Sequence, residues 1–134
     1  MMLSERPEKA RILEMCRKVV LSRFHEDVKI QEIALFSAGG WWELENFDTV
    51  VRIVRELAEA AGVKFAGAGL RPHAFLLRQN DKVTEEGKAV LNAVKKAGYE
   101  FVTQGKMRKE IFEAISHPLI PREELTAKYN NIMQ

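Results

Sequence analysis

The segment "IQEIALFSAGGWWELENFDTVVRIVRELAEAAGVKFAGAG", residues 30–69, carries the clearest structural pattern in this 134-residue chain. It opens with an apolar run over residues 30–37, which is typical of a buried parallel strand. An amphipathic helix follows, because apolar residues recur at three- and four-residue steps from Phe47 to Ala61, and Gly62 supplies a stop. Residues 63–69 form a second, shorter strand candidate. Strand, crossover helix and strand make a βαβ unit, so we predict two parallel, neighbouring strands.

Helices are predicted on both sides of this unit. Pro72 argues against a strand that continues beyond residue 69, so the segment up to residue 81 is expected to be an irregular connection. Gly98 lies inside the longest predicted helix and costs about 1 kcal/mol relative to alanine, which close packing at that position would offset. Apolar periodicity predicts helices over residues 7–24, 84–103, 106–116 and 121–133, with a polar connector at 25–29.

The predicted fold class is α/β in a single domain, with an N-terminal helix and connector at residues 1–29 and the α/β part at residues 30–134. Only two good strands can be found, and a two-stranded parallel sheet leaves one long edge open. We therefore expect another chain to complete the sheet. One arrangement is a homodimer in which the edges of the 30–37 strands pair antiparallel across a two-fold axis. The other is a complementary chain.

Composition excludes several classes of function. The 21 basic and 19 acidic residues nearly cancel and do not cluster, which disfavours nucleic-acid binding. Cys16 is the only cysteine, so neither a disulfide framework nor a cysteine-based metal site is expected, and a reducing, cytoplasmic compartment fits. No apolar run approaches the roughly 18 residues of a membrane span. His25 and His117 have no ligand at metal-binding spacing, so no metal is expected.

Several of these segments carry a resemblance to a known family. The strand "EIALFSAGG", the helix that follows it and "LRPHAFLL" before a long helix all match, and so does the tail pattern G-K-x-x-x-E-x-x-E-A-I-S-x-P-L-I-P at residues 105–121. Over residues 30–134 the chain resembles the carboxy-terminal half of the flavodoxin-like flavoproteins, in the branch of the NAD(P)H-dependent FMN reductases and iron–sulfur flavoproteins. This resemblance implies a parallel sheet with helices on both faces and FMN outside the carboxyl ends of the strands.

Mapped by this resemblance, residues 30–37 would be the fourth strand of the complete family fold and residues 63–68 the fifth. The loop from Ser37 to Glu43 would border the isoalloxazine ring of FMN. The residues that the resemblance assigns to cofactor binding are Ser37, Ala38, Gly39, Gly40, Trp41 and Trp42. Relatives hold the FMN phosphate on a loop after a first strand, and some carry a cysteine cluster; neither feature is found in this sequence. The resemblance therefore predicts a truncated or partial flavoprotein.

Two candidate sites each have a competing structural interpretation. Trp41 and Trp42 offer flat faces for an aromatic ligand, with Gly39 and Gly40 leaving backbone amides open to a ring edge. We favour the alternative that these tryptophans pack in the core or at an interface. His73, with Arg71, follows the second strand at the same rim and could act as a general acid or contact an anion. We favour a solvated loop histidine.

Three hypotheses for function follow. The first is a partial flavodoxin-like domain that oligomerises through its open strand edge. The second is an enzyme, in which this chain supplies the ring side of an FMN site and another chain supplies the phosphate side, for hydride transfer from NAD(P)H to flavin. The third is a non-catalytic interaction module anchored by the two tryptophans.

Overall fold

The structure, a computed structural model, describes residues 11–12, 14–15 and 29–133. The first four of these are helical, and the remainder of the helix predicted over 7–24 lies outside the described residues, together with Cys16 and His25. The elements follow in this order: β1 (Glu32–Ala38), η1 (Leu44–Phe47), α2 (Asp48–Ala61), β2 (Lys64–Arg71), η2 (Ala74–Leu77), β3 (Arg78–Gln79), β4 (Lys82–Val83), α3 (Glu85–Gln104), α4 (Lys109–Ser116) and α5 (Arg122–Ile132).

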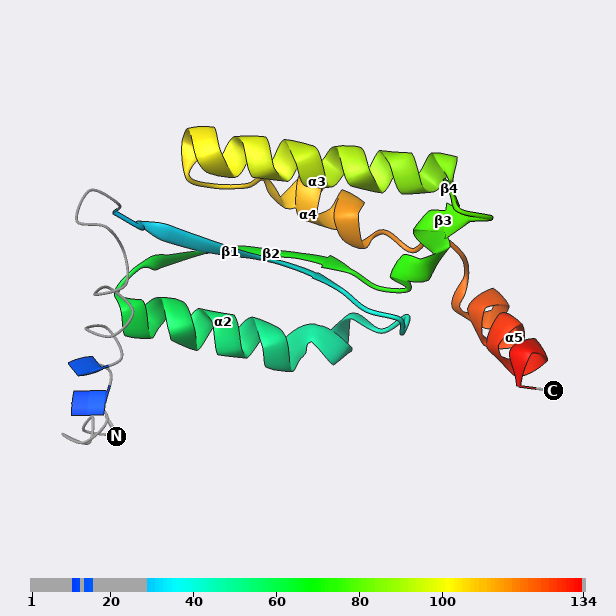
Figure 1. Cartoon of the computed structure of the whole chain (residues 1–134), viewed down its shortest axis with the longest axis horizontal. Coiled ribbons are helices and arrows are strands. Elements are labelled where there is room, and N and C mark those ends of the chain that lie inside the picture. The colour runs from blue at the N-terminus through cyan, green and yellow to red at the C-terminus, as the bar shows by residue number, and fades with distance from the viewer. Residues whose placement is uncertain (1–10, 13, 16–28, 134) are drawn as a thin grey trace.

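Three layers make up the fold (Figure 1). The central layer is β1 and β2, which pair in parallel from Glu32 opposite Lys64 to Ala38 opposite Arg71. Helix α2 covers one face of this sheet, and α3 and α4 cover the other. Gly62 ends α2 in the left-handed conformation, with φ at 68°. The predicted βαβ unit with two parallel, neighbouring strands is thus confirmed as a mixed α/β fold.

The ladder between the two strands contains one irregularity. Ile33 lies opposite Phe65 but Ala34 lies opposite Gly67, so β2 carries one extra residue and bulges there. Gly67 has a φ of 129°, and a Cβ atom at this position would lie 2.7 Å from the ring of Phe112 in α4. Both the backbone conformation and the close approach of α4 therefore require glycine.

The hydrophobic core lies between the sheet and the pair α3 and α4. Small residues on α3 allow this helix to lie close to the strands. Larger side chains, from α4 and the segment before it, fill the space between α4 and the sheet. The side chain of Thr84 caps α3 by accepting a hydrogen bond of 2.9 Å from the Gly87 amide. The core cluster consists of Ala93, Ala97, Met107, Ile111 and Ile115, against which Ala34 and Ala66 of the strands pack.

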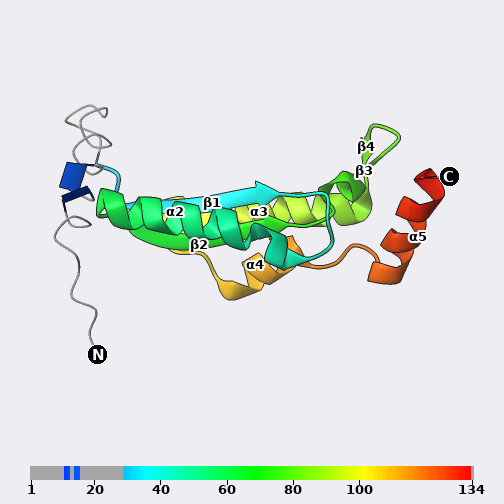
Figure 2. The same cartoon turned by 90° about the horizontal axis from the view of Figure 1, so that it is seen from below.

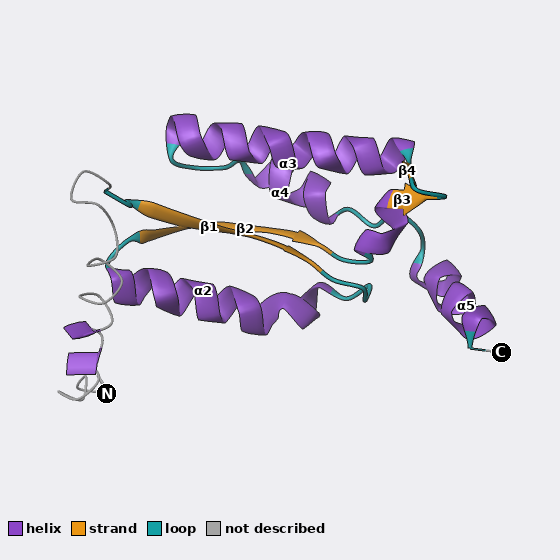
Figure 3. Cartoon of the chain, in the orientation of Figure 1, coloured by secondary structure: helices purple, strands orange, loops and turns teal. Residues whose placement is uncertain are grey.

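Four details differ from the sequence predictions. Strand β2 runs to Arg71, beyond its predicted end, and the helix predicted from residue 106 begins at Lys109. The connection predicted as irregular contains the short antiparallel hairpin β3–β4 (Figure 3), turned by Asn80 and Asp81 with φ of 48° and 61°. The close packing that could have offset the cost of Gly98 is not found, because no described atom outside its chain neighbours and the nearby backbone of α3 lies within 4 Å of the position of a Cβ there.

Candidate functional site

The loop after β1 is held by its backbone against the segment that follows β2. The Gly39 amide donates to the Arg71 carbonyl at 3.0 Å, and the Gly39 carbonyl accepts from Ala74 at 2.9 Å. The Trp41 carbonyl accepts from the His73 amide at 2.8 Å. These hydrogen bonds extend the ladder past the ends of both strands. The Gly39 amide, which was expected to face a ligand, instead donates to the Arg71 carbonyl.

The two adjacent tryptophans lie in different surroundings. Trp42 is half-buried, and its indole N–H donates to the Ile120 carbonyl at 3.4 Å. The guanidinium of Arg122 lies 6.0 Å from the Trp42 ring centroid and also forms an ion pair of 2.6 Å with Glu43. Trp42 thus fixes the start of α5 to the loop after β1. Within the chain it is a packing residue.

Trp41, by contrast, is 66% exposed. One of its neighbours is Tyr129 of α5, whose ring centroid lies 5.8 Å away. The Tyr129 hydroxyl donates to the Gly40 carbonyl at 3.0 Å, and Phe75 meets the Tyr129 ring edge-on at 5.9 Å. These contacts hold Trp41 at the rim of the sheet and leave much of its indole surface open.

A depression of 270 Å³ lies at the carboxyl end of β1. Four of the six predicted cofactor residues line it: Ser37, Ala38, Gly39 and Trp41. The other lining residues are Glu43, Asn46, Phe47 and Val50. Its volume is near the lower limit for a small-molecule site. Among the described residues, no cation lines it. The depression therefore offers a flat indole and short polar groups, but no charge partner for a phosphate. Trp42 lines a neighbouring cavity of 340 Å³ against α5, and Trp41 lines this cavity as well.

Arg71 and His73 form a buried polar cluster beneath this rim. The Arg71 guanidinium donates to the carbonyls of Pro72 at 2.7 Å, Ile115 at 2.6 Å and His117 at 2.8 Å. Its Nη2 atom lies 3.1 Å from the His73 Nε2 atom. Backbone oxygens thus surround a buried cation, and desolvation lowers the pKa of Arg71 to about 10. The cluster ties the end of β2 to the end of α4.

The solvated-loop interpretation of His73 is wrong, because this side chain is fully buried. Its Nε2 atom accepts from the Leu119 amide at 3.0 Å and faces Arg71, so the ring is neutral and carries its proton on Nδ1. Burial first, and the charge of Arg71 second, lower the pKa of His73 to about 4. No hydrogen-bond partner of Nδ1 lies among the described residues. His73 is therefore a structural acceptor.

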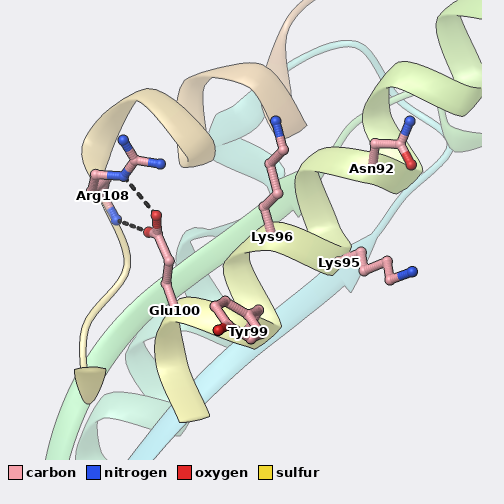
Figure 4. Close-up of a pocket in the computed structure, with 6 residues that line it drawn as sticks. All are labelled: Asn92, Lys95, Lys96, Tyr99, Glu100 and Arg108. Atoms are coloured by element: carbon pink, nitrogen blue, oxygen red, sulfur yellow. Dashed lines mark hydrogen bonds and ion pairs between the residues drawn. The ribbon is translucent and has the colours of Figure 1, made fainter. Parts of the chain in front are cut away.

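A wider depression of 500 Å³ lies on the outer side of α3 (Figure 4), with Lys95, Lys96 and Tyr99 among its lining residues. The buried Glu100 accepts from Arg108 through Nε at 2.6 Å and through the backbone amide at 3.1 Å. Figure 4 shows Glu100 pointing to Arg108, and the drawn interactions join only these two residues. This ion pair fixes the start of α4 against α3, and the two charges neutralise each other.

The outer edge of β1 is the most unusual feature of the described chain. The Lys64 amide donates to the Gln31 carbonyl at 3.0 Å, and the Gly39 amide donates to Arg71 of β2. Odd-numbered residues of β1 therefore direct their backbone polar groups toward β2, and even-numbered ones direct theirs away from it. Among the described residues, no strand pairs with this outward side.

Apolar side chains of α2 border this open edge. Arg55 lies 5.5 Å from the ring centroid of Phe65 in β2, so the Arg55 side of α2 faces β2. Ile53 and Leu57 are each two residues from Arg55, which places them about 160° around the helix. Both are exposed on the side of β1.

The same arrangement holds for α3. Glu100 contacts Arg108 at the start of α4, and α4 lies on the β2 side of α3 (Figure 2). Leu91, Gly98 and Val102 lie about 160–180° around α3 from Glu100, so they face the β1 side. Leu91 is exposed and Val102 is 82% exposed. Phe36 of β1 itself is also exposed. An unpaired strand edge thus lies between two apolar helix flanks.

Comparisons with protein-family models, with curated proteins and with solved structures give no match. In the part of the chain that the structure describes, no helix combines the length and apolar character needed to cross a membrane. Nor do three or more His, Cys, Asp or Glu side chains of these residues gather as a metal site would require.

Proposed function

We propose that this chain is an assembly module: a partial flavodoxin-like α/β unit whose sheet is completed at the β1 edge by another polypeptide chain. The observation that carries this proposal is the unpaired outer side of β1 between the exposed apolar flanks of α2 and α3. Proteins normally protect such edges with charges, prolines or bulges. The segment Ile33–Ala38 has no charge or proline, and the bulge lies in β2.

A proline at Ala34 tests this proposal. The Ala34 amide points away from β2, so proline there removes a donor only from the open edge and no bond of the β1–β2 ladder. In an extract of cells that express the tagged chain, we expect wild type to elute above the mass of its tagged monomer, which is 15.3 kDa plus the tag, and Ala34→Pro to elute as a monomer. Circular dichroism checks that the variant is folded.

Two flank variants provide the matched comparison. Leu57→Lys places a charge on the β1 side of α2 and is expected to shift the elution toward the monomer. Arg55→Ala alters the β2 side of the same helix and should leave the elution unchanged. Wild type that elutes as a monomer in the extract, or a complex that Ala34→Pro leaves intact, would refute the proposal.

A second candidate function rests on the depression that Ser37, Ala38, Gly39 and Trp41 line. We propose that this rim contacts the flavin ring, as half of an NAD(P)H-dependent FMN oxidoreductase whose phosphate-binding half another chain supplies. When bound, the flavin would carry the electrons. The contribution of this chain is to hold the flat ring against the open face of Trp41.

Fluorescence separates this candidate from simple packing. In Trp42→Phe, where Trp41 is the remaining tryptophan, flavin should quench the emission; in Trp41→Phe, quenching should be weak. FMN and riboflavin should quench the isolated chain alike, because no cation lines the depression to favour the phosphate. Unquenched emission of Trp42→Phe at high flavin concentration would exclude the site.

A further inference from the structure

We infer that the chain completing the β1 edge is a second copy of this protein, paired antiparallel to β1 about a two-fold axis at Leu35. This inference rests on the assembly function proposed above. It adds the identity of the partner, the register of the strands and the helix contacts that accompany them.

The register follows from the length and the parity of β1. Pairing all seven residues with the same seven in reverse places Leu35 opposite Leu35 of the second copy. Ala34 then lies opposite Phe36 of the second copy. Both residues direct their backbone groups outward, so each pair can exchange two hydrogen bonds. The full-length register is therefore also the one that satisfies the free backbone groups.

The charge pattern favours a second copy over a different partner. No charged side chain lies between Ile33 and Ala38, so this edge has no charge with which to select an acidic or basic strand. In the Leu35-centred register Glu32 faces Ala38. The two Glu32 side chains are then about 20 Å apart along the strands. Each is already paired with its own Lys64 at 3.0 Å. Within the paired strands, no charged side chain repels the second copy.

The helix flanks also complement themselves. A two-fold axis through the strand pair brings α2 beside α2 and α3 beside α3, each antiparallel. Ile53 and Leu57 are one helical turn apart, so in an antiparallel pair each meets the other on the second copy. On α3, the empty space at Gly98 lets the helix backbones approach. Lys95 borders this flank and keeps its charged end in solvent.

Cysteine cross-linking of the purified chain tests the inference, in a Cys16→Ser background. In the Leu35-centred register Leu35 faces itself in a pair without backbone hydrogen bonds, where the Cα atoms lie about 4.5 Å apart, close enough for a disulfide. Leu35→Cys should form a covalent dimer under mild oxidation. Ile33→Cys should not, because it faces Ser37. The double variant Ile33→Cys/Ser37→Cys should restore the dimer.

Light scattering of the wild-type chain at micromolar concentration completes the test, with twice 15.3 kDa expected. A monomer that Leu35→Cys does not cross-link overturns the second copy as partner. If the complex in the cell extract still depends on Ala34, the assembly function survives and the partner is a different chain. A dimer cross-linked through Ile33→Cys alone overturns the register and the two-fold axis at Leu35.

Discussion

The two outer edges of the sheet differ in how they are protected. Along β2 the chain bulges at Gly67, Arg55 lies over Phe65, and the end of the strand is locked by Arg71. Along β1 the strand is regular and uncharged over Ile33–Ala38, and the neighbouring helix flanks are apolar. A bulge and nearby charges are features that discourage strand addition. The β2 edge carries both features, whereas Ile33–Ala38 of β1 carries neither.

The greatest loss of stability is expected when the Arg71 hydrogen bonds that tie the end of β2 to the end of α4 are removed. Arg71→Met removes a buried guanidinium and leaves the Ile115 and His117 carbonyls without their donor, so we expect the free energy of unfolding to fall by about 3–5 kcal/mol. Urea denaturation measures this change. The control Arg55→Met removes an exposed cation from the same edge and should cost less than about 1 kcal/mol. Equal losses in the two variants would contradict the role of Arg71.

A smaller loss of stability is expected at low pH, through His73, which lies beside Arg71. The pKa of His73 is about 4 in the folded chain, below the ordinary value of 6.5, so below pH 6.5 the unfolded chain binds a proton that the folded chain does not. Neutral His73 therefore makes its whole contribution to the free energy of unfolding above pH 6.5. As the pH falls toward 4, this free energy decreases by about 2 kcal/mol.

Urea denaturation at pH 7 and pH 4.5 measures the contribution of His73 to this loss. His73→Gln keeps an acceptor for Leu119 but does not titrate. The difference in the free energy of unfolding between the two pH values should shrink by about 2 kcal/mol in this variant. An unchanged difference would show that His73 does not titrate as described.

A further prediction concerns the α3 flank beside β1. Gly98→Ala places a methyl group into empty space on α3, so in the monomer we expect the free energy of unfolding to rise by up to about 1 kcal/mol. Thermal melting of the variant in the Ala34→Pro background, where the open edge is blocked, measures this gain. A loss of stability there would mean that Gly98 is already packed in the monomer.

The βαβ core could be predicted from the sequence because its signals are local. The apolar strand, the helical periodicity and the stop at Gly62 all lie within one continuous stretch. The hairpin β3–β4 was also signalled, by the pair Asn80-Asp81, whose short polar side chains tolerate positive φ. The prediction for this connection used Pro72 alone, which ends β2 only after Arg71.

The polar cluster could not be predicted, because its partners are distant along the chain. Arg71 meets carbonyls 44 and 46 residues away, and His73 accepts from an amide 46 residues away. A histidine beside an arginine in a connecting segment gives no indication of burial. The separation of Trp41 from Trp42 has the same origin, since Trp42 is anchored by a carbonyl 78 residues further on.

The attachment of α5 has a consequence for local opening of the fold. Three interactions described above join this helix and the residues just before it to the loop after β1: Trp42 with Ile120, Glu43 with Arg122, and Gly40 with Tyr129. Because these contacts are shared, α5 cannot detach without releasing the loop. The amides of α5 and those of residues 40–43 should therefore exchange with solvent as one cooperative unit, with a common opening free energy below that of the core.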